Sequence, residues 1–194
     1  CRPFDLNRKG LSLGEGAAIL VIEEADHARR RGARVYAEVR GYGLTADGHH
    51  MTAPDPEGQG AFRAMGAALM DSGIEPKEVD AINAHGTATT ANDLAETKAI
   101  KELFKARAGK IPVSAIKSMI GHCLGASGAV EAAALTLTVA RGVIPPTVHH
   151  GETDPECAID VVANTARQQR VRCGVSTSLA FGGNDSALVI SAYR

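Results

Sequence analysis

The feature that most constrains the fold is a unit of strand, polar turn and helix that occurs twice in succession. Short apolar segments at residues 79–84 and 111–116 each lead into a polar turn that contains glycine. A segment with helical spacing follows each turn, at about 92–106 and 125–141. Strands that alternate with helices pair in parallel and carry the helices on the faces of the sheet. The pattern therefore predicts an α/β fold.

The rest of the chain extends this predicted sheet. Residues 171–178 and 186–192 predict the two arms of a closing hairpin. Residues 16–23 are expected to form a strand that is buried on both faces, because the segment is almost entirely apolar. An alternating segment at 35–42 predicts a further strand, and 61–72 predicts a helix. A mixed sheet covered by helices is the expected architecture.

The composition excludes several classes of protein. Lys and Arg number 21 against 22 Asp and Glu, so the net charge of −1 supplies no field that would attract nucleic acid or an anionic membrane. Aromatic residues make up only 4%, which disfavours base-stacking platforms. The longest apolar run, residues 17–22, is far shorter than the roughly 20 residues of a membrane helix. We expect a single domain, residues 1–194, of a cytoplasmic protein.

Two histidines and a lysine follow the paired strands at one edge of the predicted sheet. His85 comes after the strand at 79–84, and Lys117 and His122 come after the strand at 111–116. Ligands of open α/β sheets collect outside the carboxyl ends of the strands. Parallel neighbouring strands would therefore bring two imidazoles and an ammonium group to one pocket. The alternative is a structural, hydrogen-bonded role for each histidine, and their equivalent positions favour the shared site.

Other residues that could bind a metal or an anion, or act as nucleophiles, give weaker signals. The pairs His49-His50 and His149-His150 have no Cys or carboxylate partners at ligand spacing, so no metal site is expected. The glycine-rich stretch 121–128 fits neither a P-loop nor a dinucleotide fingerprint, and its small residues suit a helix buried between layers. The cysteines form no CxxC pair and are expected to be ordinary thiols. They are Cys1, Cys123, Cys157 and Cys173.

Four blocks of sequence carry the pattern of a known family. They are Arg2-Pro-Phe-Asp…Gly14-Glu-Gly-Ala17, Asn83-Ala-His-Gly-Thr-Ala-Thr89, Lys117-Ser-Met-Ile-Gly-His122…Glu131 and Phe181-Gly-Gly183. In this order and spacing they resemble the β-ketoacyl-acyl carrier protein synthases, the elongating condensing enzymes of fatty acid and type II polyketide biosynthesis. The resemblance covers the whole chain but only the C-terminal half of the family's enzyme. It implies the C-terminal half of a thiolase-like fold: a mixed β-sheet with helices on both faces, layered with the missing N-terminal half.

The resemblance implies a catalytic role for four of the matching residues. His85 and His122 match the two active-site histidines of the family. Lys117 matches the lysine that orders the site, and Glu131 matches the glutamate that pairs with this lysine. The chemistry agrees, because decarboxylation of a malonyl thioester develops negative charge on the thioester oxygen, which two neutral imidazoles stabilise by donating N–H bonds. A neighbouring ammonium group disfavours protonation of those imidazoles.

Five further residues match the substrate channel and its gate. Thr87 and Thr89 match the threonines that hold the pantetheine arm. Phe181 matches the gating phenylalanine, whose backbone N–H also forms part of the oxyanion hole. Gly182 and Gly183 match the flexible turn behind it, where glycine permits the change of backbone conformation that a moving gate requires.

Two features depart from the family's pattern. Asn184-Asp185 follows the glycines where many members have Thr-Asn, which predicts different contacts at this edge of the site. The nucleophilic cysteine of the family lies in an Ala-Cys-Ser-type elbow, and none of the four cysteines of this chain has that context. Claisen condensation requires a covalent acyl thioester. The acylated cysteine is therefore expected on an N-terminal half or on a partner chain.

The resemblance also implies what the complete enzyme binds. An acyl carrier protein is the expected partner, and it brings 4'-phosphopantetheine with it, so no cofactor is expected on this chain. Complete ketosynthase units are expected to form dimers.

Three functions are compatible with these features. The leading hypothesis is the C-terminal half of an acyltransferase that condenses an acyl thioester with malonyl-acyl carrier protein and is inactive without the cysteine-bearing half. A non-catalytic partner subunit resembling a chain-length factor is the alternative, but it has no need of both histidines and the lysine. A stand-alone thioester-binding or decarboxylating module would expose an open sheet edge. The block from Lys117 to His122 disfavours thiolases and chalcone synthases.

Overall fold

A six-stranded mixed sheet lies at the centre of the computed structural model, which describes residues 1–193. Its strand order is β1-β8-β7-β2-β3-β5. β2 pairs in parallel with both β3 and β7, while β7 pairs antiparallel with β8 as a hairpin. The prediction of two parallel strand–helix units and a closing hairpin is confirmed. The strands are β1 (Glu38–Ala46), β2 (Ala81–Asn83), β3 (Pro112–Ser114), β4 (Val143–Ile144), β5 (Asp160–Val161), β6 (Arg167–Gln168), β7 (Cys173–Ala180) and β8 (Asn184–Ser191).

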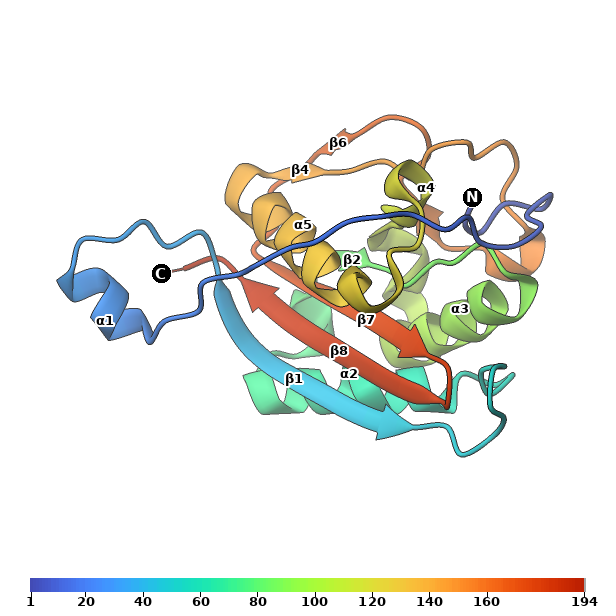
Figure 1. Cartoon of the computed structure of the whole chain (residues 1–194), viewed down its shortest axis with the longest axis horizontal. Helices are drawn as coiled ribbons and strands as arrows, with labels where there is room; N and C mark the ends of the chain where they lie inside the picture. The colour runs from blue at the N-terminus through green and yellow to red at the C-terminus, as the bar shows by residue number, and fades with distance from the viewer. Residues whose placement is uncertain (194) are drawn as a thin grey trace.

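Helices cover both faces of this sheet, as predicted. α2 and α3 pack against one face, and α5 lies across the other (Figure 1). The short helix α4 follows β3 in a segment that was expected to be a turn only. β4 and β6 form a small separate pair that the sequence pattern did not predict. The helices are α1 (Ala25–Arg30), α2 (Gln59–Ser72), α3 (Thr90–Phe104), α4 (Lys117–Ile120) and α5 (Ser127–Arg141).

Small residues let α2 approach the sheet closely. Its buried side chains recur at helical spacing and include Ala61, Met65 and Leu69. Gly41 and Gly43 of β1 lie beneath the helix, and a Cβ on Gly41 would lie only 2.5 Å from a carbonyl oxygen of α2. Glycine is therefore required there for contact between helix and strand.

Each face of the sheet has its own apolar core. The core under α2 and α3 includes Phe4, Met65 and Val175, which are fully buried. The smaller core under α5 is centred on Leu135. Gly174 of β7 makes room for this leucine, because a Cβ at Gly174 would lie 2.6 Å from its Cδ1. The sheet is thereby fixed from both sides at the strands that carry the site.

The predicted strand at residues 16–23 is wrong. This segment has no regular secondary structure, and Ile19, Val21 and Ile22 are 94%, 83% and 76% exposed. The physical reason is that a strand needs a neighbour to satisfy its backbone groups, and nothing within residues 1–193 pairs with it. The segment passes in front of α5 and then runs out to α1, away from the body of the molecule (Figure 1).

α5 is covered less completely than the prediction of a helix between two layers implied. Its sheet-facing residues, such as Leu135, are buried, but Val130 and Ala133 are partly exposed and Leu137 is exposed. Within the described part of the chain, this outer side of α5 is partly open to solvent. Of the two layers that were expected to cover α5, the structure therefore shows the one formed by the sheet.

Candidate active site

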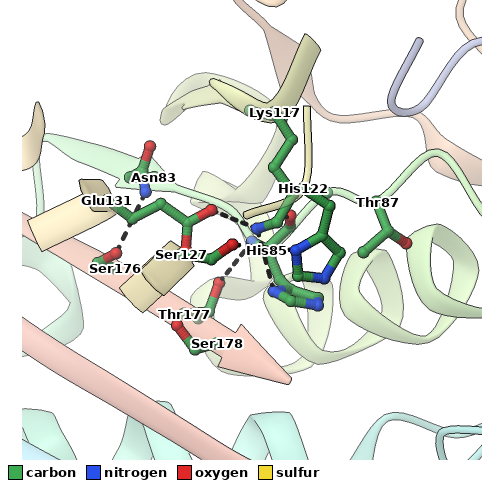
Figure 2. A network of polar contacts seen from close by, with 12 residues as sticks. Asn83, His85, Thr87, Lys117, His122, Ser127, Glu131, Ser176, Thr177 and Ser178 are labelled. Carbon is green, nitrogen blue, oxygen red and sulfur yellow. Dashed lines mark hydrogen bonds and ion pairs between the residues drawn. The ribbon is translucent and has the colours of Figure 1, made fainter. Parts of the chain in front are cut away.

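The two predicted histidines meet at the carboxyl edge of the sheet. His85 lies two residues beyond β2, and α4 carries the chain from β3 to His122. β2 and β3 are parallel neighbours, so both histidines reach the same edge. Their ring centroids are 5.3 Å apart and the rings are nearly perpendicular, at 83° (Figure 2). The predicted convergence is confirmed.

The hydrogen bonds of the two rings assign the position of their protons. The Leu124 backbone N–H donates to His122 Nδ1 at 3.1 Å. The Lys117 ammonium group, which can only donate, lies 3.2 Å from His85 Nδ1. Each Nδ1 therefore accepts, and each neutral ring carries its proton on Nε2. The site presents two Nε2–H donors.

Burial and a neighbouring cation hold both rings in the neutral form. His85 is only 5% exposed, and this burial, together with the charge of Lys117 and the charge that His122 carries when protonated, lowers its pKa well below the usual value of 6.5. The pKa of His122 is lowered by burial and by Lys117. A positive charge close to an imidazole opposes its protonation. Both rings are therefore neutral at neutral pH.

Lys117 occupies the buried centre of this group. Its side chain is 1% exposed, and Nζ donates to the His85 carbonyl oxygen at 2.7 Å. Nζ also forms an ion pair with Glu131, which lies in the second turn of α5 (Figure 2). Burial raises the pKa of Glu131 to about 7, against the opposing effect of the lysine. A buried charge requires a partner of this kind, and the pair links the turn after β2 to α5.

A strap of the N-terminal segment holds His122 from the other side. The His122 backbone N–H donates to the Ser12 carbonyl oxygen at 2.8 Å, and the Gly14 N–H donates to the His122 carbonyl oxygen at 3.1 Å. The two chains touch so closely that a Cβ on Gly121 would lie 2.8 Å from Gly14 Cα. The backbone at His122 is thereby fixed by sequence-distant residues.

Glu96 of α3 is a site residue that the sequence reasoning missed. It is fully buried and accepts hydrogen bonds from the backbone N–H groups of His85 and Gly86, at 2.8 and 2.9 Å. The hydroxyl of Thr177 on β7 donates to it at 2.6 Å. One carboxylate thus connects the turn after β2, a helix and a strand.

A signal for this residue exists in the sequence. Asp93 and Glu96 lie three residues apart and share a helical face with Ile100, so both acidic groups point at the sheet. Asp93 is also fully buried, and accepts hydrogen bonds from the backbone N–H groups of Phe4 and Ala88. Acidic residues on the buried face of a helix need donors there. Applied to this spacing, the rule identifies Asp93 and Glu96 as buried acidic groups that accept hydrogen bonds.

The sequence between residues 36 and 151 matches the family described as beta-ketoacyl synthase, C-terminal domain. This match covers more than half of the chain. The chain belongs to the β-ketoacyl synthase family.

Similar proteins support the assignment over the full chain. The 3-oxoacyl-(acyl-carrier-protein) synthase 2 of Staphylococcus aureus (strain COL) is 49% identical over 194 residues, which are 100% of this chain and 47% of the relative. The solved ishigamide ketosynthase/chain length factor is 46% identical with a TM-score of 0.96, and the match covers 100% of this chain and 47% of that one.

A solved ketosynthase in complex with a type II polyketide synthase acyl-carrier protein and bound to a hexaketide has a TM-score of 0.97 at 36% identity, with the same coverage of 100% and 47%. The chain therefore spans about half the length of the proteins it matches. The thiolase-like ketosynthase fold and the correspondence to its C-terminal half are confirmed.

The predicted threonines follow His85 closely in the chain, and the turn at residues 181–183 joins β7 to β8. The hydroxyls of Thr87 and Thr89 are 2.8 Å apart, and Thr89 also caps α3 by accepting the Asn92 N–H. The Thr89 hydroxyl therefore has a structural task in addition to its predicted one. Phe181 lies in the turn between β7 and β8 and is 69% exposed. Gly182 and Gly183 follow it in left-handed conformations, with φ of +84° and +73°.

The cysteines are free thiols, as expected. Burial raises the pKa of the Cys157 thiol, and raises that of Cys173 to about 12, so both are poor nucleophiles. Cys1 and Cys123 are partly exposed. In residues 1–193 no group of three or more His, Cys, Asp or Glu side chains is arranged to hold a metal ion. Over the same residues, no helix has both the length and the apolar character needed to span a bilayer.

Proposed function

We propose that this chain supplies the decarboxylating part of a β-ketoacyl-acyl carrier protein synthase. The observation that carries the proposal is the pair of neutral imidazoles, with ring centroids 5.3 Å apart, that present two Nε2–H donors beside a buried ammonium group. When a malonyl thioester loses CO2, the electron pair of the broken C–C bond becomes an enolate with charge on the thioester oxygen. Two fixed N–H donors stabilise that oxygen in the transition state.

The enolate carbon then attacks the acyl group held as a thioester on a cysteine. The new C–C bond forms as the C–S bond breaks, and the electron pair leaves with the cysteine sulfur as thiolate. No cysteine of this chain is placed in the family's nucleophile context, so the acylated cysteine is proposed to come from the N-terminal half or from a partner chain. The chain alone is then inactive.

Lys117 is proposed to act by position and charge. Its ammonium group is buried, paired with Glu131 and bonded to the His85 carbonyl oxygen, and an ammonium held in this way is a poor nucleophile. Its positive charge supports the neutral state of both imidazoles. Glu131 compensates the charge and orients the lysine.

The substrate channel and the gate are also proposals. Thr87 and Thr89 are proposed to hold the pantetheine arm of an acyl carrier protein, and Phe181 to gate the site and donate its backbone N–H to the oxyanion hole. Gly182 and Gly183 give the gate its freedom, which their left-handed backbone supports. A similar ketosynthase is in complex with an acyl-carrier protein, which supports that partner. No resident cofactor is proposed, because the pantetheine arrives on the carrier.

The setting of the complete enzyme follows from the same resemblance. Ketosynthase units are proposed to form dimers, and a cytoplasmic location is proposed for them. A role as a chain-length factor is the second candidate, since one similar structure is a ketosynthase/chain length factor. The complete set of His85, His122, Lys117 and Glu131 favours the enzyme, because a subunit that only shapes a pocket does not need it.

Removal of one imidazole tests the proposal. In the complete synthase, His85→Ala or His122→Ala should lower the decarboxylation of malonyl-acyl carrier protein by about a hundred- to a thousand-fold, because each removes one donor to the developing oxyanion. Acyl transfer to the cysteine should suffer less. His27→Ala, on the exposed helix α1, is the matched control. Decarboxylation within about threefold of the parent enzyme in both variants would contradict the assigned roles and favour the chain-length-factor alternative.

A further inference from the structure

The turn that carries Phe181 is fastened to a second loop. We define the gate turn as residues 180–184 and the clasp loop as residues 47–58, which follow β1. The clasp loop comes near the gate turn because β1 pairs with β8 and places Thr45 opposite Asp185. The Gly182 N–H donates to the Met51 carbonyl oxygen at 2.7 Å, and the Asp47 N–H donates to the Gly183 carbonyl oxygen at 2.8 Å. Two backbone hydrogen bonds therefore join the segments.

Two carboxyl groups face each other beside these hydrogen bonds. Asp185 is only 2% exposed. Among the described residues, no N–H or O–H group donates a hydrogen bond to its Oδ2. A methyl group added to Gly60, in the first turn of α2, would collide with Asp185 Oδ2 and Asp47 Oδ1 at the same time. The two oxygens therefore point into one small space.

Such a pair is stable only when it holds a proton. Two carboxylates that share a site repel each other when both are charged, whereas one proton between them gives a short, charge-assisted O–H···O bond. Burial and the neighbouring carboxyl group of Asp47 raise the pKa of Asp185 to about 8. Arg63 of α2 opposes this rise, and Glu96 of α3 adds to it.

The groups around Asp47 and Asp185 leave a shared proton to balance the negative charge of the two carboxyl groups. Arg63 acts on Asp185 through its charge and not through a bond to Oδ2, since its guanidinium donates to the Ala46 carbonyl oxygen at 2.9 Å. The other Asp47 oxygen, Oδ2, accepts the Asp55 N–H at 2.8 Å, which fixes this carboxylate within the clasp loop. Asp185 is thus the group whose proton completes the contact.

We propose that Asp185 is a positioning residue that latches the gate turn to the clasp loop by donating its carboxyl proton to Asp47, and that loss of this proton releases the turn. Only the catalytic meaning of the latch rests on the proposed function; the latch itself is a property of the turn. An asparagine at this position would donate a hydrogen bond without titrating. The aspartate makes the same contact dependent on pH.

Hydrogen–deuterium exchange of the complete synthase tests the latch without reference to catalysis. After correction for intrinsic exchange, opening of peptides from the gate turn and the clasp loop should increase by up to about tenfold per pH unit as the pH approaches 8, because opening releases one proton. Above pH 8 the opening should level off. Asp185→Asn should remove this pH dependence and keep the protection. Asp26→Asn, on the exposed helix α1, is the control and should behave like the parent enzyme.

Equal pH dependence of gate-turn opening in the parent enzyme and in Asp185→Asn would overturn the latch. If Asp185→Asn does not fold, Asp47→Asn decides instead. Its amide can donate to an ionised Asp185, so the pH dependence should move to lower pH by more than one unit, and an unchanged profile would overturn the proposal. A working latch in an enzyme whose histidine variants still decarboxylate would refute the proposed function alone.

Discussion

From its buried position, Lys117 contacts His85 directly and acts on His122 through its charge. Its ammonium group lies 3.2 Å from His85 Nδ1, and its charge lowers the pKa of both imidazoles. The neutral ring is the form that donates through Nε2 while Nδ1 accepts. Protonation on acidification removes that state. The protonation state of both imidazoles therefore depends on burial and on the charge of Lys117.

This charge predicts the pH profile of decarboxylation. The pKa of His85 lies well below 6.5, so activity should persist as the pH falls through 6.5 and be lost only at lower pH. In Lys117→Gln the cation is gone, protonation of both rings becomes easier, and the acidic limb should move to higher pH. The measurement is CO2 release from malonyl-acyl carrier protein between pH 5 and 8. An acidic limb at or above pH 6.5 in the parent enzyme would contradict the assignment.

Lys117→Arg tests shape at constant charge. The arginine fork is planar and larger than the compact ammonium group, so it should fit the buried position badly. We expect a large loss of condensation with the fold retained, as measured by product formation and circular dichroism. Borohydride trapping with a β-ketoacyl substrate separates electrostatics from imine chemistry. A reduced covalent adduct on Lys117 would refute the electrostatic role.

Among the elements, α3 supports the site through direct hydrogen bonds as well as through its packing on the sheet. Its Glu96 joins the turn after β2 to β7, and its N-terminus begins at the threonine pair. Glu96→Gln replaces one acceptor oxygen by an NH2 group that confronts backbone donors. The variant loses hydrogen bonds to a charged acceptor and gains an unsatisfied buried donor. Together these changes should lower the free energy of unfolding by about 2–4 kcal/mol. Urea unfolding and decarboxylation should both report the loss.

Glu102→Gln is the matched control, because this residue lies on the same helix and is exposed. It should change the free energy of unfolding by less than about 0.5 kcal/mol. A Glu96→Gln enzyme as stable and as active as this control would contradict the prediction. It would show that the hydrogen bonds from the His85 and Gly86 N–H groups to Glu96 matter neither for stability nor for activity.

The elements also show what the sequence could and could not predict. The convergence of His85, Lys117 and His122 was predictable, because carboxyl ends of parallel strands share an edge. The contact of Glu96 with Thr177 was not, because it joins residues 81 positions apart through the packing of α3 on the sheet. The strap at residues 12–14 was missed for the same reason. The strand expected at 16–23 failed because an apolar run does not show that a partner strand is present, and none pairs with this segment within residues 1–193.

For the whole molecule, the exposed apolar segment and the absent nucleophile lead to the same conclusion. Ile19, Val21 and Ile22 expose large apolar surfaces of the kind that mark contact with another polypeptide segment. The chain spans about half the length of its relatives. Both observations support a site completed by polypeptide outside these 194 residues.

Location of the acyl group tests this account most directly. The complete synthase and the isolated 194-residue chain are each incubated with acyl-acyl carrier protein, and the acylated residue is mapped by peptide mass spectrometry. We predict one thioester in the complete synthase, on a cysteine outside this chain, with 3-oxoacyl product after addition of malonyl-acyl carrier protein. The isolated chain should acquire no acyl group. A stable thioester on Cys1, Cys123, Cys157 or Cys173 in the isolated chain would contradict the account.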